Sequence, residues 1–160
     1  VALNLSAQQG IKMGLKSDTG VEAILTTRFR DMGKPIFALE GVQEQFSYFD
    51  DLDDEAQGRM LSHMVQENEM ATRNFEKMLT AWLRGDPDAI IAGMDGGLLS
   101  DPAIRDALLT RRNDKWVVRI ADMIDKGERP FVAVGAGHVA GAGGVPALLA
   151  KMGYKVTRIQ

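Results

Sequence analysis

The 160-residue sequence contains no cysteine, so disulfide bonds, thiolate metal sites and a cysteine nucleophile are all excluded. No block of lysine or arginine is long enough to follow a phosphate backbone, and the net charge is only -3, so nucleic acid is not an expected partner. No apolar run approaches the roughly 20 residues that cross a bilayer, so no membrane span is expected. What remains is a chain with 45% hydrophobic residues, which suits one globular domain over residues 1–160.

Helical patterns cover most of the first three quarters of the chain. Residues 19–33 end on a glycine that is followed by proline, as helices often do. Apolar residues spaced by three and four predict a long amphipathic helix over residues 54–83. Asp86-Pro87 and Asp101-Pro102 each place an N-cap residue before a proline, so each predicts the start of another helix. The second of these helices is expected to run to about Lys126, before Gly127.

Three apolar runs predict β-strands, namely KPIFALE (34–40), PFVAVGA (130–136) and YKVTRI (154–159). A predicted helix over residues 144–152 joins the last two runs into a βαβ unit with a right-handed crossover. We therefore expect an α/β fold: a small parallel sheet with a large helical insertion and a C-terminal βαβ unit. Because three strands make a thin sheet, further strands are expected upstream in a longer chain or in a partner subunit, such as a homo-oligomer.

The glycine-rich stretch FVAVGAGHVAGAGG (131–144) first suggests nucleotide binding. Residues 135–140 match G-x-G-x-x-G/A between a predicted strand and a predicted helix, which is the context of a dinucleotide-binding loop. However, the following strand ends without an acidic residue to hold a ribose hydroxyl, and the predicted helix begins several residues after the glycines.

A second interpretation concerns the histidine in this stretch. Gly135 and Gly137 turn the chain, and His138 then lies at the carboxyl end of a strand, where open α/β sheets place their sites. Glu40 ends another predicted strand, so if the two strands are neighbours both side chains face one edge of the sheet. A carboxylate and an imidazole there can share a divalent metal, or act as a base and the group that orients it. A third, purely structural interpretation is that small residues turn the chain and His138 caps a helix or lies in solvent. The residues alone leave the second and third interpretations open.

Four segments, in the same order, resemble the TraB/GumN family, which includes the Tiki proteins. They are residues 20–52, residues 81–90 (AWLRGDPDAI), residues 108–124 with the sequence Arg-Asn-x-x-Trp, and residues 131–159. The resemblance implies a fold related to the erythromycin-esterase and haem-binding ChaN group. It also implies a site built around two G-x-x-H motifs and a glutamate, metal-dependent protease activity as described for Tiki members, and a location in the bacterial periplasm or cell envelope.

The second G-x-x-H motif of the family matches Gly135-Ala136-Gly137-His138, but the first has no counterpart in the chain. The only other histidine, His63, has no glycine three residues before it and is expected to be solvated on the long helix. Because a catalytic zinc needs about three protein ligands, we expect the chain to be the C-terminal portion of a longer family member, with the first motif upstream of Val1.

The expected roles follow from this resemblance. His138 and Glu40 are the candidate catalytic residues and ligands of a divalent metal of unspecified identity. The candidate substrate-binding residues are Arg112, Asn113, Gly135 and Gly137. Trp116 is expected in the core rather than as a platform for a ligand.

The resemblance thus predicts a metal-dependent, protease-like hydrolase that acts on a peptide or a small molecule. The main alternative is a non-catalytic module that uses the same crevice to bind haem, iron or a peptide. Dinucleotide binding is a further alternative.

Overall fold

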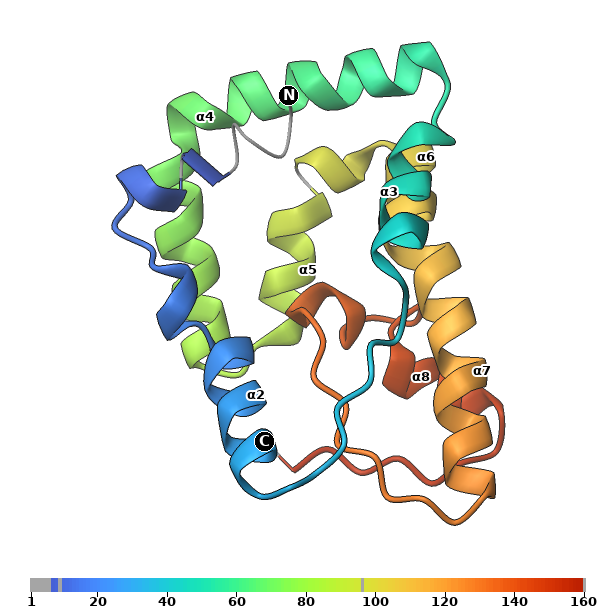
Figure 1. The fold of residues 1–160 in the computed structure, drawn as a ribbon. Helices are drawn as coiled ribbons and strands as arrows, with labels where there is room; N and C mark the ends of the chain where they lie inside the picture. Colours follow the sequence, from blue (N-terminus) through green and yellow to red (C-terminus); the bar gives the residue numbers. More distant parts are fainter. Residues whose placement is uncertain (1–6, 9, 96, 160) are drawn as a thin grey trace.

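The computed structural model describes residues 7–8, 10–95 and 97–159, and every regular element in these ranges is helical. Figure 1 shows these elements in order along the chain. The main helices are α2 (Val21–Asp31), α3 (Val42–Asp50), α4 (Asp54–Leu83), α5 (Pro87–Asp95), α6 (Pro102–Arg105), α7 (Arg111–Asp125) and α8 (Val145–Lys151). Short turns of other helix types are η1 (Ser17–Thr19), η2 (Leu98–Ser100), η3 (Asp106–Thr110) and η4 (Ala136–His138).

The predicted helix starts are confirmed at both aspartate–proline pairs. The Asp101 side chain accepts hydrogen bonds from the backbone N–H groups of Ala103 (2.9 Å) and Ile104 (3.4 Å), so it caps α6. The Asp86 side chain accepts from the Ala89 N–H at 3.0 Å, at the start of α5. These side chains pair N–H groups that have no partner within the first turn of a helix, which is why the local sequence fixes the helix boundary.

The predicted parallel sheet is wrong, and so is the C-terminal βαβ unit: residues 34–38, 128–135 and 154–159 are extended, but no strand occurs in the described part of the chain. An apolar run predicts an extended backbone with buried side chains, whereas a strand also needs a neighbouring segment that hydrogen bonds to it. Here the apolar side chains are partly buried by packing against helices instead. Val132 and Val134 pack against Trp116 and Ile120 of α7 and Val145 of α8.

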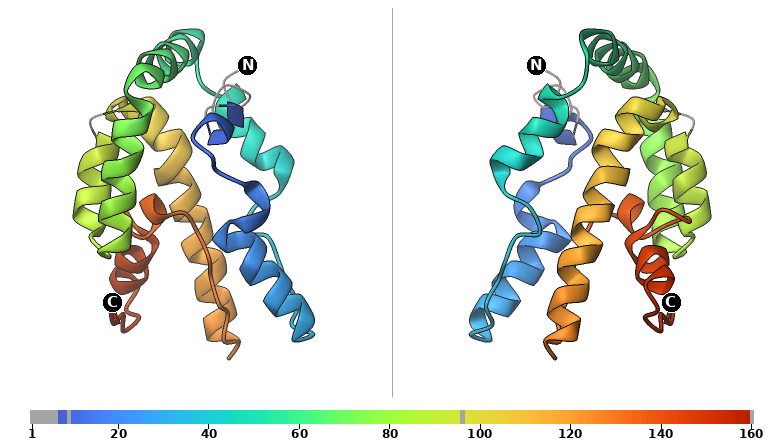
Figure 2. Two further views of the ribbon diagram at one scale, coloured as in Figure 1. Left: turned by 90° about the vertical axis from the view of Figure 1, so that its left-hand side faces the viewer. Right: turned by 90° about the vertical axis from the view of Figure 1, so that its right-hand side faces the viewer.

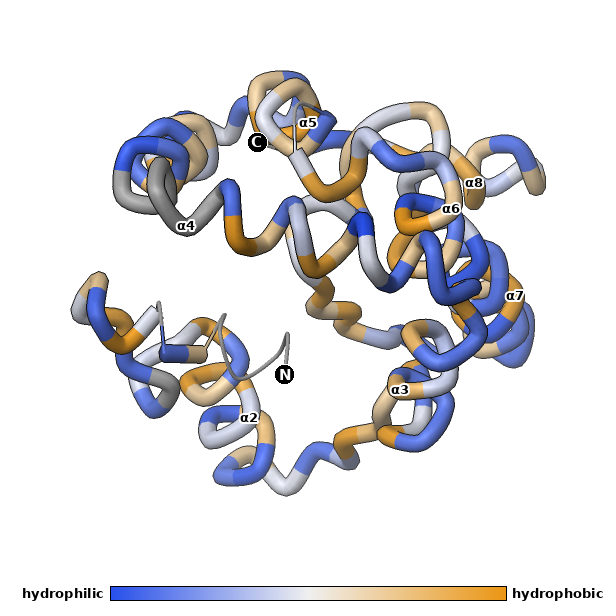
Figure 3. Tube along the Cα trace, turned by 90° about the horizontal axis from the view of Figure 1, so that it is seen from above, coloured by the Kyte–Doolittle hydropathy of each residue, from blue (hydrophilic) through white to orange (hydrophobic). Residues whose placement is uncertain are grey.

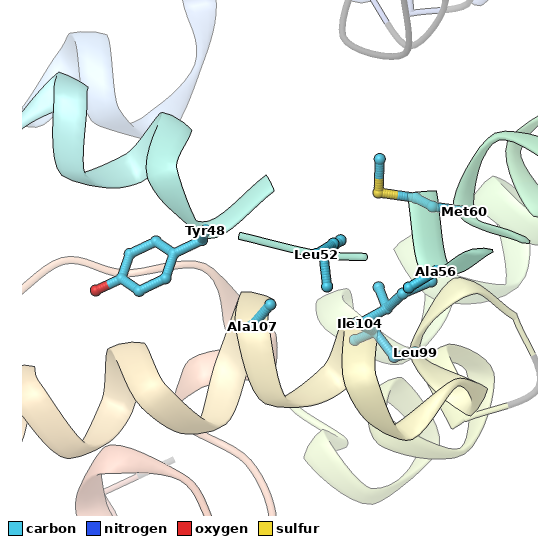
Figure 4. Close-up of a cluster of buried hydrophobic side chains, with 7 residues drawn as sticks. All are labelled: Tyr48, Leu52, Ala56, Met60, Leu99, Ile104 and Ala107. Atoms are coloured by element: carbon cyan, nitrogen blue, oxygen red, sulfur yellow. The ribbon is translucent and has the colours of Figure 1, made fainter. Parts of the chain in front are cut away.

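The largest group of buried side chains joins α3, the start of α4, η2 and the α6–η3 segment (Figure 4). Its members are Tyr48, Leu52, Ala56, Met60, Leu99, Ile104 and Ala107. This cluster anchors the N-terminal end of the continuous α6–η3–α7 helix, which carries the candidate site further along.

Figure 1 shows α4 across the top and down one side of the molecule, α7 on the opposite side, and the extended segments between α2 and α7. The views in Figure 2 show α2 standing apart from α4 and α5, and α2 contains no buried residue. None of the helices in the described ranges is both long and apolar enough to cross a bilayer.

Candidate functional site

The candidate site is organised by α7, through three residues near its N-terminal end. Arg112, Asn113 and Trp116 are spaced i, i+1 and i+4, which places them on adjoining parts of the helix surface. Their side chains contact both of the residues that the sequence singled out, Glu40 and His138.

Glu40 lies just before α3 and forms a bidentate ion pair with Arg112. Arg112 Nη2 lies 2.7 Å from Glu40 Oε1 and Arg112 Nε lies 3.1 Å from Oε2. The indole Nε1–H of Trp116 donates to the same Oε2 at 3.2 Å. The Glu40 and Arg112 side chains are only 10% and 15% exposed, so this is a largely buried, charge-assisted pair.

His138 is buried in η4 and is oriented by Asn113, whose Oδ1 lies 2.7 Å from His138 Nδ1. The Asn113 amide nitrogen donates to the carbonyl oxygen of Gly143 at 2.8 Å. Because that carbonyl can only accept, the amide nitrogen must face Gly143 and the amide oxygen must face the imidazole. His138 Nδ1 therefore carries the proton, and the lone pair lies on Nε2, which has no hydrogen bond within the described ranges.

Burial, together with the nearby charge of Arg112, lowers the pKa of His138 from 6.5 to about 4. The imidazole is therefore neutral at pH 7. The Trp116 ring lies against it, with the two ring centroids 4.4 Å apart. A buried, neutral imidazole with its tautomer fixed through Nδ1 is the form in which histidine binds a metal through Nε2.

Comparisons with known proteins identify the family of the chain. A model of the TraB/PrgY/gumN family matches residues 1–158. The chain belongs to this family. It is 27% identical over 149 residues to the proteins described as "Uncharacterized protein YbaP" in Escherichia coli (strain K12) and in Shigella flexneri. The match covers 93% of this chain and 54% of each relative, so the chain spans about half the length of these relatives. No solved structure matches the chain.

In this TraB/PrgY/gumN chain, two of the glycines around His138 lie close to neighbouring atoms. A Cβ atom at Gly137 would lie 2.8 Å from Met94 Cε, and one at Gly144 would lie 2.7 Å from the backbone oxygen of Ala140. Gly135 starts the η4 turn, since its carbonyl accepts from the His138 N–H at 2.9 Å. Gly135 and Gly137 therefore shape the turn that presents His138, and their predicted role in substrate binding stays a prediction.

The described residues of this family member do not complete a metal site. No group of three or more histidine, aspartate or glutamate side chains suitable for a metal occurs among them. His138 has the right protonation and a free Nε2, but the carboxylate of Glu40 is paired with Arg112, whose positive charge would repel a cation. His63 lies elsewhere, in a surface depression on α4 lined by Glu55 and Arg59.

Two contributions of α7 were missed when only the sequence was considered. Trp116 is buried as expected, but it also donates to Glu40 and covers His138, and the Arg-Asn-x-x-Trp spacing could have indicated this. Lys115 extends the site outwards: its Nζ lies 2.9 Å from Glu44 Oε1, and this hydrogen bond lowers the pKa of Glu44.

Proposed function

We propose that this chain supplies one imidazole, with the residues that position it, to the site of a metal-dependent, protease-like hydrolase. The observation that carries the proposal is the state of His138: buried, neutral at pH 7, and held by Asn113 with the Nε2 lone pair unpaired within the described ranges. Membership of the TraB/PrgY/gumN family supports the choice of this residue, because His138 ends the G-x-x-H motif.

The low pKa favours a metal ligand over a general base as the role of His138. A general base is most effective when its pKa lies near the working pH, and a pKa of about 4 makes the imidazole a poor proton acceptor at pH 7. Coordination requires the neutral ring, which is the form present. In hydrolases of this class a divalent metal activates water or polarises a carbonyl group.

Glu40 is better suited to positioning than to coordination. Its carboxylate accepts from Arg112 and Trp116, so it fixes the side chains of both. Trp116 in turn packs on the imidazole and keeps water from that face of the ring. The other ligands that a metal requires would come from polypeptide outside the described residues.

The proposal is tested by metal binding and activity in the longest natural polypeptide that carries this chain. We expect the His138→Ala variant to lose most of its bound divalent metal and its peptide hydrolysis, with His63→Ala as the matched control that keeps both. Metal content measured by mass spectrometry gives a readout that is independent of turnover. Unchanged metal content and activity in the His138→Ala variant would refute the proposal.

A second candidate is a non-catalytic module that binds haem, iron or a peptide. One observation favours it: the described residues offer a single free imidazole nitrogen beside an aromatic ring, and one such nitrogen is enough for an axial haem ligand. Titration with haem separates the two candidates, because a Soret shift that His138→Ala abolishes requires no turnover. The dinucleotide alternative has less support, since α8 begins at Val145, several residues after the motif glycines Gly135 and Gly137.

A further inference from the structure

Two neighbouring extended segments of the chain are covered on one side only. Residues 131–134 follow α7, and residues 35–37 follow α2; Phe131 is linked to α2 by a ring contact with Phe29, at a centroid distance of 5.3 Å. Val132, Val134 and Leu39, just after the second segment, all pack on the Trp116–Ile120–Val145 cluster. Helices α7 and α8 therefore cover one side of these segments.

The remaining side chains of the two segments are apolar and exposed. Phe37 is 71% exposed, Phe131 is 63% exposed and Ile36 is 49% exposed. The neighbouring helix α2 has no buried residue of its own. We refer to residues 35–37 and 131–134 as the open face. Large aromatic and branched side chains gathered in this way on a surface mark an interaction site.

The backbone of the two segments also lacks a backbone partner among the described residues. Within the described ranges, no backbone–backbone hydrogen bond is made by residues 35–37 or 131–134. An extended segment with free N–H and C=O groups can pair with another extended polypeptide, and its alternating side chains then select the sequence that binds. The tube in Figure 3, seen from above, shows α2 well separated from α4 and α5, so these two helices do not cover α2.

We propose that the open face is the docking surface for an extended, apolar polypeptide segment from the part of the longer family proteins that this chain does not match. The match covers only 54% of the E. coli and Shigella relatives, so these proteins contain a large amount of additional chain. That proportion favours this occupant over a second copy of the chain. The docked segment pairs with the backbone of residues 35–37 and 131–134 and covers Phe37 and Phe131. This proposal is independent of whether His138 binds a metal.

Hydrogen exchange tests the proposal in two polypeptides, the 160-residue chain alone and the longest natural polypeptide that carries this chain. We expect the amides of residues 35–37 and 131–134 to exchange at least about tenfold more slowly in the longer polypeptide than in the chain alone. The Phe37→Ser variant of the longer polypeptide should restore fast exchange there. The matched control is Val118→Ser, at an exposed residue of α7, which should change nothing in these segments.

Continued slow exchange in α7 shows that each variant remains folded. Equal exchange rates of residues 35–37 and 131–134 in the longer polypeptide and in the chain alone would overturn the proposal. Protection that appears in the chain alone as its concentration rises, together with a dimer mass, would also overturn it and would identify a second copy as the occupant.

Discussion

His138 should couple the stability of the chain to pH. Its pKa in the folded chain is about 4, while an unfolded histidine titrates near 6.5, so the unfolded state takes up the proton first as the pH falls. The contribution of the neutral, buried imidazole is therefore complete above pH 6.5 and is lost progressively between pH 6.5 and pH 4. At ~1.4 kcal/mol for each pKa unit, the loss is about 3 kcal/mol. Burial is the main cause of the lowered pKa of His138, and the charge of Arg112 is the second. This pH dependence is therefore expected only while His138 remains buried in η4.

Urea unfolding at pH 7, 5.5 and 4.5 measures this effect. Between pH 7 and pH 4.5 we expect the free energy of unfolding to fall by about 2.4 kcal/mol more in the unsubstituted chain than in His138→Gln, which has no imidazole to titrate. The matched control is His63→Gln, which removes the other histidine and should follow the unsubstituted chain at every pH. Other acidic groups titrate in all three proteins, so only the difference between them is interpreted. If the curve of His138→Gln runs parallel to that of the unsubstituted chain, the imidazole is not buried in the neutral form, and the reasoning is refuted.

Two further predictions concern the ion pair and the glycine loop. Arg112→Met leaves the largely buried Glu40 carboxylate without its charged partner, so it should cost about 3 kcal/mol of unfolding free energy. The double variant with Glu40→Gln should recover much of this loss in urea unfolding, whereas purely additive losses would contradict the pairing. Gly144→Ala places a Cβ atom 2.7 Å from the Ala140 carbonyl oxygen and should cost about 1–3 kcal/mol. Gly143→Ala, which meets nothing within 4 Å, should change stability by no more than about 0.5 kcal/mol, and an equal loss in both would contradict the close approach.

The helices could be predicted from sequence because their signals are local. Asp101 caps α6 with its own side chain, and Gly127 follows the end of α7 with a φ of 79°, a conformation that glycine adopts readily. The predicted sheet was wrong, because a strand depends on a partner that is distant in sequence. Residues 130–135 lie outside any helix, and the two valines among them pack inwards, but α7 and α8 take the place that the prediction gave to neighbouring strands.

The side chains that contact Glu40 and His138 differ from those expected from the sequence. Glu40 and His138 were expected to lie at the same edge of a sheet, where they would share a metal or act as a base and the group that orients it. In the structure Glu40 pairs with Arg112, and His138 pairs with Asn113. Sequence reasoning could not assign these pairs, because each joins residues at least 25 positions apart along the chain.

Helix α7 therefore positions Glu40 and His138, a role that the prediction assigned to the edge of a sheet. Consecutive residues of α7 differ by about 100° in direction, so Arg112 can reach Glu40 while Asn113 reaches His138. Trp116 lies one turn further on and contacts both, which ties the ion pair to the imidazole. The relative position of Glu40 and His138 is thus fixed by the rigidity of α7. Glu40 influences His138 indirectly, since it holds in place the guanidinium group that helps to lower the histidine pKa.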